Sequence, residues 1–78
     1  MTENARSLRA IRNELGISRE RLARKTENLS SGTIRNAEFG RHRVTLDKAG
    51  QILAAINCLL SEAQKPVVSM DDLNIRLY

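Results

Sequence analysis

Aromatic side chains are almost absent from this sequence, which has one Phe, one Tyr and no Trp among 78 residues. A hydrophobic core must therefore be built from Leu, Ile, Val and Ala, and an aliphatic core of this kind suits packed helices. Cysteine is also scarce: Cys58 stands alone, which excludes an intrachain disulfide and a metal site with several thiolate ligands. We expect Cys58 to be a small packed apolar residue rather than a nucleophile, in a reducing compartment.

Long apolar runs are missing as well. No stretch approaches the roughly 20 residues that span a bilayer, and the first residues, MTENARS, are polar where a secretory signal is apolar. These absences predict a cytoplasmic protein without a membrane partner. The chain also has no glycine-rich phosphate loop, no paired carboxylates and no metal-ligand spacing, and it is too short to enclose a substrate. We therefore expect no enzyme, no cofactor and no bound metal.

Positive charge is concentrated in the first part of the chain. Residues 1–45 contain ten Lys and Arg against five Asp and Glu, whereas residues 46–78 contain three against four. A basic half joined to a nearly neutral one indicates a surface for a polyanion on an ordinary scaffold.

Apolar spacing predicts three helices in the basic half. Segment 5–15 has apolar residues at helical spacing and stops before Gly16, which favours a left-handed helix end. Ser18 and Ser30 are the N-cap residues expected for two short helices that follow, of which the second spans 31–38.

The second half predicts one long helix and one short helix. The long one begins at Thr45, keeps the 3.6-residue period over several turns and ends at Pro66. Ser69 and Asp72 have the spacing of a capping box, which predicts a fifth helix from about Met70 to Ile75. We expect an all-α, compact five-helix domain over residues 1–78, with 64–78 as a C-terminal extension.

Four apolar residues near the start of this extension have two interpretations. They supply either a contact between two copies of the chain in a homodimer, which we prefer, or the last part of the monomer's own core. They are Leu59, Leu60, Val67 and Val68.

Five motifs in this order resemble a known family. LRAIRNELGIS, RERLARK, LSSGTIRNAEFGRHR, TLDKAGQILAAIN and VSMDDL together resemble the lambda-repressor-like, Cro/C1-type (XRE) helix-turn-helix family, from about Ser7 to Leu73. The resemblance implies that the second and third helices form the helix-turn-helix, and that the chain is a sequence-specific DNA-binding transcriptional regulator of the repressor type. It also implies an ion pair between Arg12 and Glu38; the alternative is that both side chains are solvated.

The chain departs from the family pattern at several places. Arg19 stands where glutamine is usual, the turn between Lys25 and Ser30 is longer than the common form, and Gly32 occupies a position that often carries a base-reading side chain. The angle between the two helices of the motif is therefore not fixed by the resemblance.

Helix 31–38 is expected to enter the major groove of double-stranded DNA. Its candidate base-reading residues are Ser31, Gly32, Arg35 and Asn36. The candidates for contacts with the DNA backbone or minor groove are Ser18, Arg19, Ser30, Arg41, His42 and Arg43. An alternative function is that of an antitoxin or another module that uses the same fold to bind a protein partner.

Overall fold

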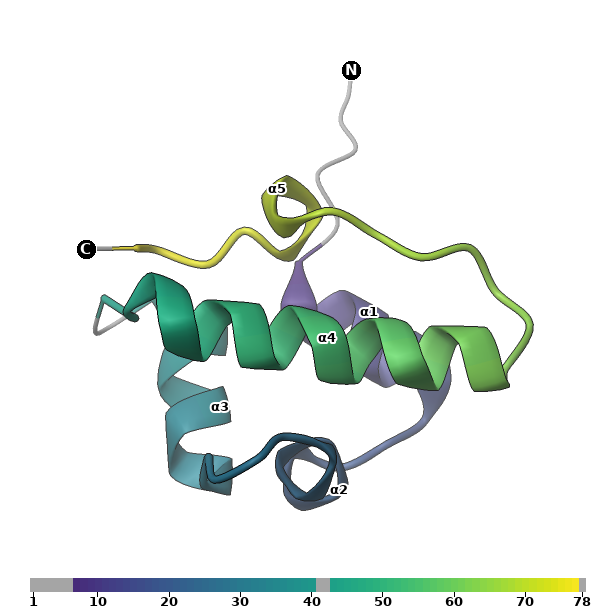
Figure 1. Ribbon diagram of the computed structural model, residues 1–78, viewed down its shortest axis with the longest axis horizontal. Coiled ribbons are helices and arrows are strands. Elements are labelled where there is room, and N and C mark those ends of the chain that lie inside the picture. The colour runs from purple at the N-terminus through teal and green to yellow at the C-terminus, as the bar shows by residue number, and fades with distance from the viewer. Residues whose placement is uncertain (1–6, 41–42, 78) are drawn as a thin grey trace.

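Five helices and their connections make up the computed structural model, which describes residues 7–40 and 43–77. Figure 1 shows α4 crossing the middle of the molecule, with α1 behind it, α2 and α3 below it and α5 above it. Their bounds are α1 Leu8–Leu15, α2 Arg19–Lys25, α3 Ser31–Phe39, α4 Leu46–Glu62 and α5 Met70–Leu73. Within the described ranges there is no strand, so the predicted all-α, five-helix architecture is confirmed.

Four helices begin at a side chain that caps the first turn. Ser18 accepts a hydrogen bond from the backbone N–H of Arg21, and Ser30 accepts one from that of Thr33, at 3.1 and 3.2 Å. The two predicted caps are therefore confirmed. Thr45, predicted as the start of the long helix, caps α4 in the same way, and the helix begins at Leu46. Ser7 caps α1 and has an extended backbone, so the helix begins at Leu8. The predicted segment 5–15 therefore started too early, and its end at residue 15 is correct.

The core is aliphatic and is shared by every helix. It is formed around α4, whose buried face lies against α1, α2 and α5, while α2 also packs against α3. The largest fully buried side chains are Leu8, Ile11, Leu22, Ile34, Ile52, Ile56, Leu60 and Leu73. This packing fixes α2 and α3 relative to the rest of the domain.

The end of α4 corrects two predictions. The helix stops at Glu62 and the chain turns at Gln64, which has a φ of 60°, so the helix ends before Pro66 is reached. Cys58 is exposed rather than packed. It lies one turn from both Ala54 and Glu62, on the face of α4 that points away from the core.

The C-terminal segment is part of the domain's core. Leu73 is buried in α5, and the backbone N–H of Val44 donates to the carbonyl of Arg76 at 2.8 Å, next to an isolated bridge between Val44 and Leu77. Asn57 of α4 holds the incoming chain by two hydrogen bonds with the backbone of Val68, at 2.8 and 3.0 Å. Segment 64–77 is thus tied to the body of the monomer at several points.

This packing bears on the two interpretations of the four apolar residues. Leu59 and Leu60 are buried within the monomer and belong to its own core, and Val68 is partly buried against that core. Val67 alone remains exposed, at 61%. Val68 reaches the core because the returning chain is held on α4 by Asn57, a contact that local spacing does not reveal.

Candidate nucleic-acid interface

The turn between α2 and α3 is ordered by one threonine. The hydroxyl of Thr26 donates to the carbonyl of Ala23 at 2.5 Å and accepts from the backbone N–H of Leu29 at 3.2 Å. Leu29 is half-buried and packs against the core. The longer turn noted in the sequence is therefore a defined connection, in which the hydroxyl substitutes for part of the backbone hydrogen bonding.

An ion cluster joins α1, α2 and α3. Arg12 Nε donates to Glu38 Oε2 at 2.6 Å, and Arg19 Nε donates to Glu38 Oε1 at 3.0 Å. The Glu38 side chain is fully buried, whereas those of Arg12 and Arg19 are 10% and 29% exposed. Arg12 also donates from its Nη1 to the carbonyl of Ile17 at 2.9 Å. The carboxylate thus fixes the end of α3 to both preceding helices.

The arrangement contains the Arg12–Glu38 contact expected from the resemblance and excludes the alternative that both side chains are solvated. Arg19, a candidate for contacts with the DNA backbone, also binds the Glu38 carboxylate. The Nε of Arg19 is occupied by Glu38, and the two terminal nitrogens make no hydrogen bond within residues 7–40 and 43–77. A guanidinium group held at one edge in this way keeps its outer donors for another acceptor.

The outer face of α3 is polar. Ile34 and Ala37 face the core, with 0% and 2% exposure. Arg35, Asn36 and Gly32 are exposed on the opposite side, and Ser31 is half-buried. The four predicted base-reading residues are thus distributed along the accessible side of one helix.

Phe39 is a member of this surface that the sequence analysis missed. Its side chain is 43% exposed, and its ring centroid lies 5.4 Å from the guanidinium carbon of Arg19 and 5.7 Å from that of Arg35. The available signal was the i, i+4 spacing of Arg35 and Phe39, which places two side chains together on a helix surface.

The basic segment after α3 is described only in part. Gly40 ends the helix with a φ of 66°, and Arg43 is exposed. Arg41 and His42, both predicted to contact the DNA backbone or minor groove, lie outside the described residues.

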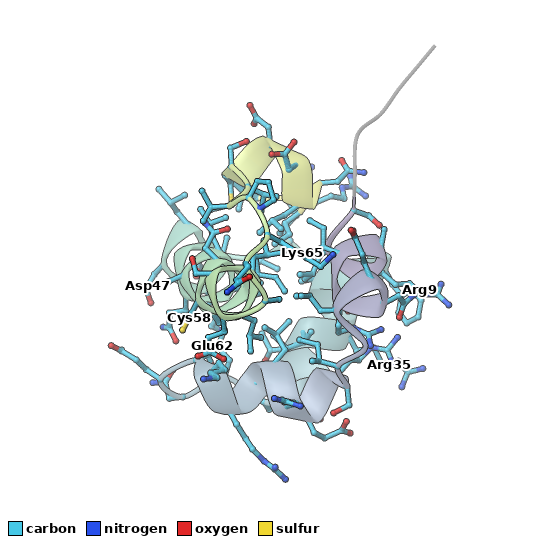
Figure 2. All side chains as sticks on the ribbon, turned by 90° about the vertical axis from the view of Figure 1, so that its right-hand side faces the viewer. Arg9, Arg35, Asp47, Cys58, Glu62 and Lys65 are labelled. Atoms are coloured by element: carbon cyan, nitrogen blue, oxygen red, sulfur yellow. The ribbon has the colours of Figure 1, made fainter. Side chains whose placement is uncertain are left out.

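Two exposed arginines extend to the same side of the molecule. In Figure 2, Arg9 and Arg35 extend to one side, while Asp47, Cys58 and Glu62 lie on the other. The pKa of Glu62 is lowered, first by a hydrogen bond from Lys25 and then by the positive charge of that lysine. The side that carries Arg9 and Arg35 therefore offers positive charge to an anionic partner.

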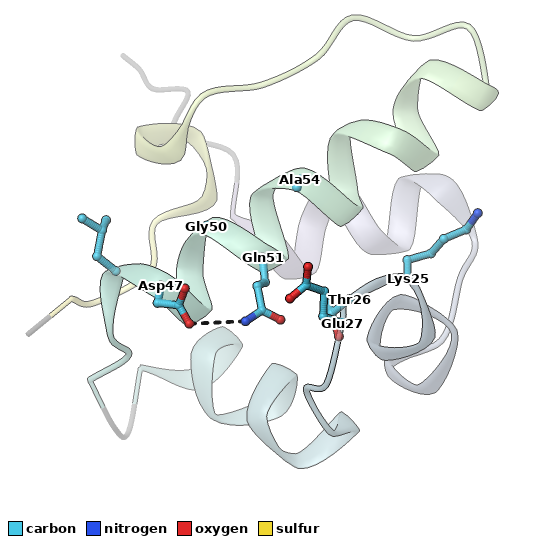
Figure 3. Close-up of a pocket in the computed structure, with 8 residues that line it drawn as sticks. Lys25, Thr26, Glu27, Asp47, Gly50, Gln51 and Ala54 are labelled. Carbon is cyan, nitrogen blue, oxygen red and sulfur yellow. Dashed lines mark hydrogen bonds between the residues drawn. The ribbon is translucent and has the colours of Figure 1, made fainter.

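A cavity of about 560 Å³ lies between the end of α2 and the first turns of α4 (Figure 3). Two carboxylates, those of Glu27 and Asp47, line it, and Gln51 Nε2 donates to Asp47 Oδ2 at 3.4 Å. Lys25 lines it as well, and none of the lining residues belongs to α3. No group of three metal-ligating side chains occurs among the described residues, and none of their helices is long and apolar enough to cross a membrane.

Comparison with known proteins gives one match. The profile of a helix-turn-helix family matches residues 8–62, which include α1 to α4 and thus both helices of the motif. No curated protein and no solved structure matches the chain. The family is typically non-catalytic, and its domain implies DNA binding. The match covers more than half of the chain, and the protein therefore belongs to the helix-turn-helix family of the Cro/C1 (XRE) type.

Proposed function

We propose that this protein is a sequence-specific transcriptional regulator that reads the major groove of DNA with the outer face of α3. The observation that carries the proposal is the division of this helix into a buried face and a polar face. Ile34 and Ala37 hold one side in the core, while Arg35 and Asn36 are exposed on the other. Buried Glu38 anchors the same helix to α1 and α2, so the exposed side chains start from a fixed backbone.

The exposed side chains have the chemistry of base recognition. An arginine pairs with guanine O6 and N7, and an asparagine pairs with adenine N6 and N7, each through two hydrogen bonds. Arg35 and Asn36 supply these two groups on adjacent positions. Ser31 adds a hydroxyl near the start of the helix, and Gly32 has no side chain, so the backbone there approaches the groove closely.

Contacts with the DNA backbone fix the position of α3 in the groove. The N-terminus of α3 at Ser30 offers unpaired N–H groups to a phosphate, and the outer donors of Arg19 and the exposed Arg43 add positive charge. Ser18 takes the corresponding place at α2, and Arg41 and His42 complete the set. These contacts attract any DNA sequence, because phosphates are the same at every position.

Two copies of the chain are part of the proposal. One recognition helix contacts only about three or four bases, whereas two copies related by symmetry double the number of base contacts. The exposed Val67 and the outer part of the segment that contains it are available for such a contact. A homodimer would bind two half-sites about one helical turn, ~10 bp, apart.

Selection of bound sites from a pool of random DNA tests the function. We expect one enriched consensus with inverted symmetry, and a complex whose mass in analytical ultracentrifugation corresponds to two chains per site. A pool that stays random after repeated selection contradicts sequence-specific binding. An asymmetric consensus bound by one chain retains DNA recognition and contradicts the homodimer.

A further inference from the structure

Phe39 is an unusual surface residue in this molecule. It is the single aromatic side chain in the part of the chain that the structure describes, and 43% of it is exposed at the end of the helix that faces DNA in our proposal. An aromatic ring that lies partly in solvent contributes less to the core than a buried leucine. Its neighbours indicate what the ring does.

Two arginines from different helices meet at this ring. Arg19 comes from the first turn of α2 and Arg35 from the middle of α3, and their guanidinium carbons lie 5.4 and 5.7 Å from the ring centroid. Both distances fall within the range in which a cation is attracted to the negative face of an aromatic ring. One ring therefore contacts two positively charged side chains.

The two arginines depend on the ring to different degrees. Arg19 is held independently, because its Nε donates to the buried carboxylate of Glu38 at 3.0 Å. Arg35 is exposed, and the ring of Phe39 is its one partner among the described residues. Without the ring, the Arg35 side chain would sample many rotamers and would lose that freedom on binding.

We infer that Phe39 is a positioning residue for recognition of guanine: its ring orients the guanidinium group of Arg35 before DNA arrives. A planar guanidinium group must present two N–H donors to guanine O6 and N7 in one orientation. A side chain already held near that orientation loses less conformational entropy on binding and therefore binds more tightly. This inference depends on the proposed DNA-reading function.

The matched variants are Phe39→Leu and Phe39→Tyr. Leucine keeps an apolar side chain of similar reach but has no aromatic face, whereas tyrosine keeps the face. We expect Phe39→Leu to reduce the affinity ratio between operator and scrambled DNA by about two- to fivefold, as expected for one exposed cation–π contact. Phe39→Tyr should retain the wild-type ratio. The urea unfolding midpoints of all three proteins should differ little, because the ring is 43% exposed and is not part of the buried core.

A second pair of variants identifies the arginine through which the ring acts. In an Arg35→Ala background, Phe39→Leu should cause no further loss of discrimination, since the side chain that it positions is gone. In an Arg19→Ala background, the loss caused by Phe39→Leu should persist. The opposite pattern would assign the effect to Arg19 and overturn the inference.

A measurement without DNA tests the contact itself. In the free wild-type protein, NMR signals of the Arg35 side chain should carry ring-current shifts that disappear in Phe39→Leu and remain in Phe39→Tyr. Absence of these shifts overturns the inference whatever the DNA results are. Ring-current shifts together with equal discrimination by Phe39→Leu and wild type also overturn it, and leave the proposed function intact. If the wild-type protein binds operator and scrambled DNA with equal affinity, both the proposed function and the inference are contradicted.

Discussion

Removal of the Glu38 carboxylate is the perturbation whose effect the structure defines most clearly. The side chain is fully buried and accepts hydrogen bonds from Arg12 and Arg19 at 2.6 and 3.0 Å. Glu38→Ala leaves the guanidinium group of Arg12, whose side chain is 10% exposed, without its counter-charge. Loss of one partner from a buried pair costs about 3–5 kcal/mol. Arg19 is 29% exposed and is able to turn toward water, so we assign the greater share of this cost to Arg12.

A double change separates the net worth of the pair from the cost of an unpaired charge. Arg12→Met with Glu38→Leu removes both buried charges and keeps the volume apolar, which is often close to neutral for stability. The carbonyl of Ile17 loses its donor in the double variant, and an unpaired buried acceptor costs about 1–3 kcal/mol. We therefore expect the double variant to be more stable than Glu38→Ala but less stable than the wild type.

Urea unfolding followed by circular dichroism measures these differences as shifts of the midpoint. Glu27→Ala is the matched control, because Glu27 is an exposed glutamate in the turn after α2 and its removal should change the free energy of unfolding by less than about 0.5 kcal/mol. Equal and small losses for Glu38→Ala and Glu27→Ala would refute the reasoning. A double variant less stable than Glu38→Ala would refute it as well.

Three further predictions concern the scaffold, and urea unfolding measures each of them. Gly16 has a φ of 70°, so Gly16→Ala should destabilise the fold by about 1–2 kcal/mol. Gly50 lies inside α4 with open space around an added Cβ, so Gly50→Ala should stabilise the fold by about 0.5–1 kcal/mol. Stability changes of the same sign in the two variants would contradict this. Leu73→Ala should cost about 2–5 kcal/mol, because Leu73 is 1% exposed and fixes α5 on the core, and a loss well under 1 kcal/mol would mean that the C-terminal segment is dispensable. Lys25 lowers the pKa of Glu62, so the stabilisation from this pair is present above the ordinary glutamate pKa and is lost as the pH falls through the pKa of Glu62 in the fold. Lys25→Ala should accordingly differ from the wild type at neutral pH and converge with it in acid, and a difference that grows in acid would be inconsistent with this sign.

Features that depend on neighbouring residues were predictable from the sequence. The caps at Ser18, Ser30 and Thr45 are each followed by a helical apolar pattern, and a hydroxyl at that position satisfies an N–H group three residues later. The capping box of α5 was predictable for the same reason, since the backbone N–H of Ser69 donates to Asp72 at 2.9 Å. Helix type, order and approximate bounds follow from such local signals.

Features that depend on distant residues were not predictable in the same way. Arg19 reaches Glu38, which is 19 residues away in the chain, and the periodicity of either helix says nothing about this contact. Val68 is held on α4 by two hydrogen bonds with Asn57, which is 11 residues away in the chain. Cys58 is a different case: it lies one turn from Glu62 on the outer face of α4, so the helical period alone could have predicted its exposure. At the candidate site, the residues of α3 could be predicted from the sequence, whereas the contact of Phe39 with Arg19 depends on how α2 and α3 pack together.

The central claim is that α3 reads DNA bases, and one comparison of variants tests it most directly. Binding isotherms are measured for wild type, Asn36→Ala and Arg43→Ala on the selected operator and on scrambled DNA, each at two salt concentrations. Cys58→Ala serves as a control, because Cys58 is exposed on the opposite side of the molecule (Figure 2).

Asn36 offers an amide but no charge, so Asn36→Ala should cost about 1–3 kcal/mol on the operator, nothing on scrambled DNA, and leave the salt dependence unchanged. Arg43→Ala should weaken binding to both DNAs alike and reduce the slope of log K against log salt by about 0.9, as expected for one phosphate contact. Cys58→Ala should match the wild type throughout. Unchanged discrimination by Asn36→Ala, together with a loss of discrimination in Arg43→Ala, would contradict the claim and assign specificity to DNA shape read by the loop after α3.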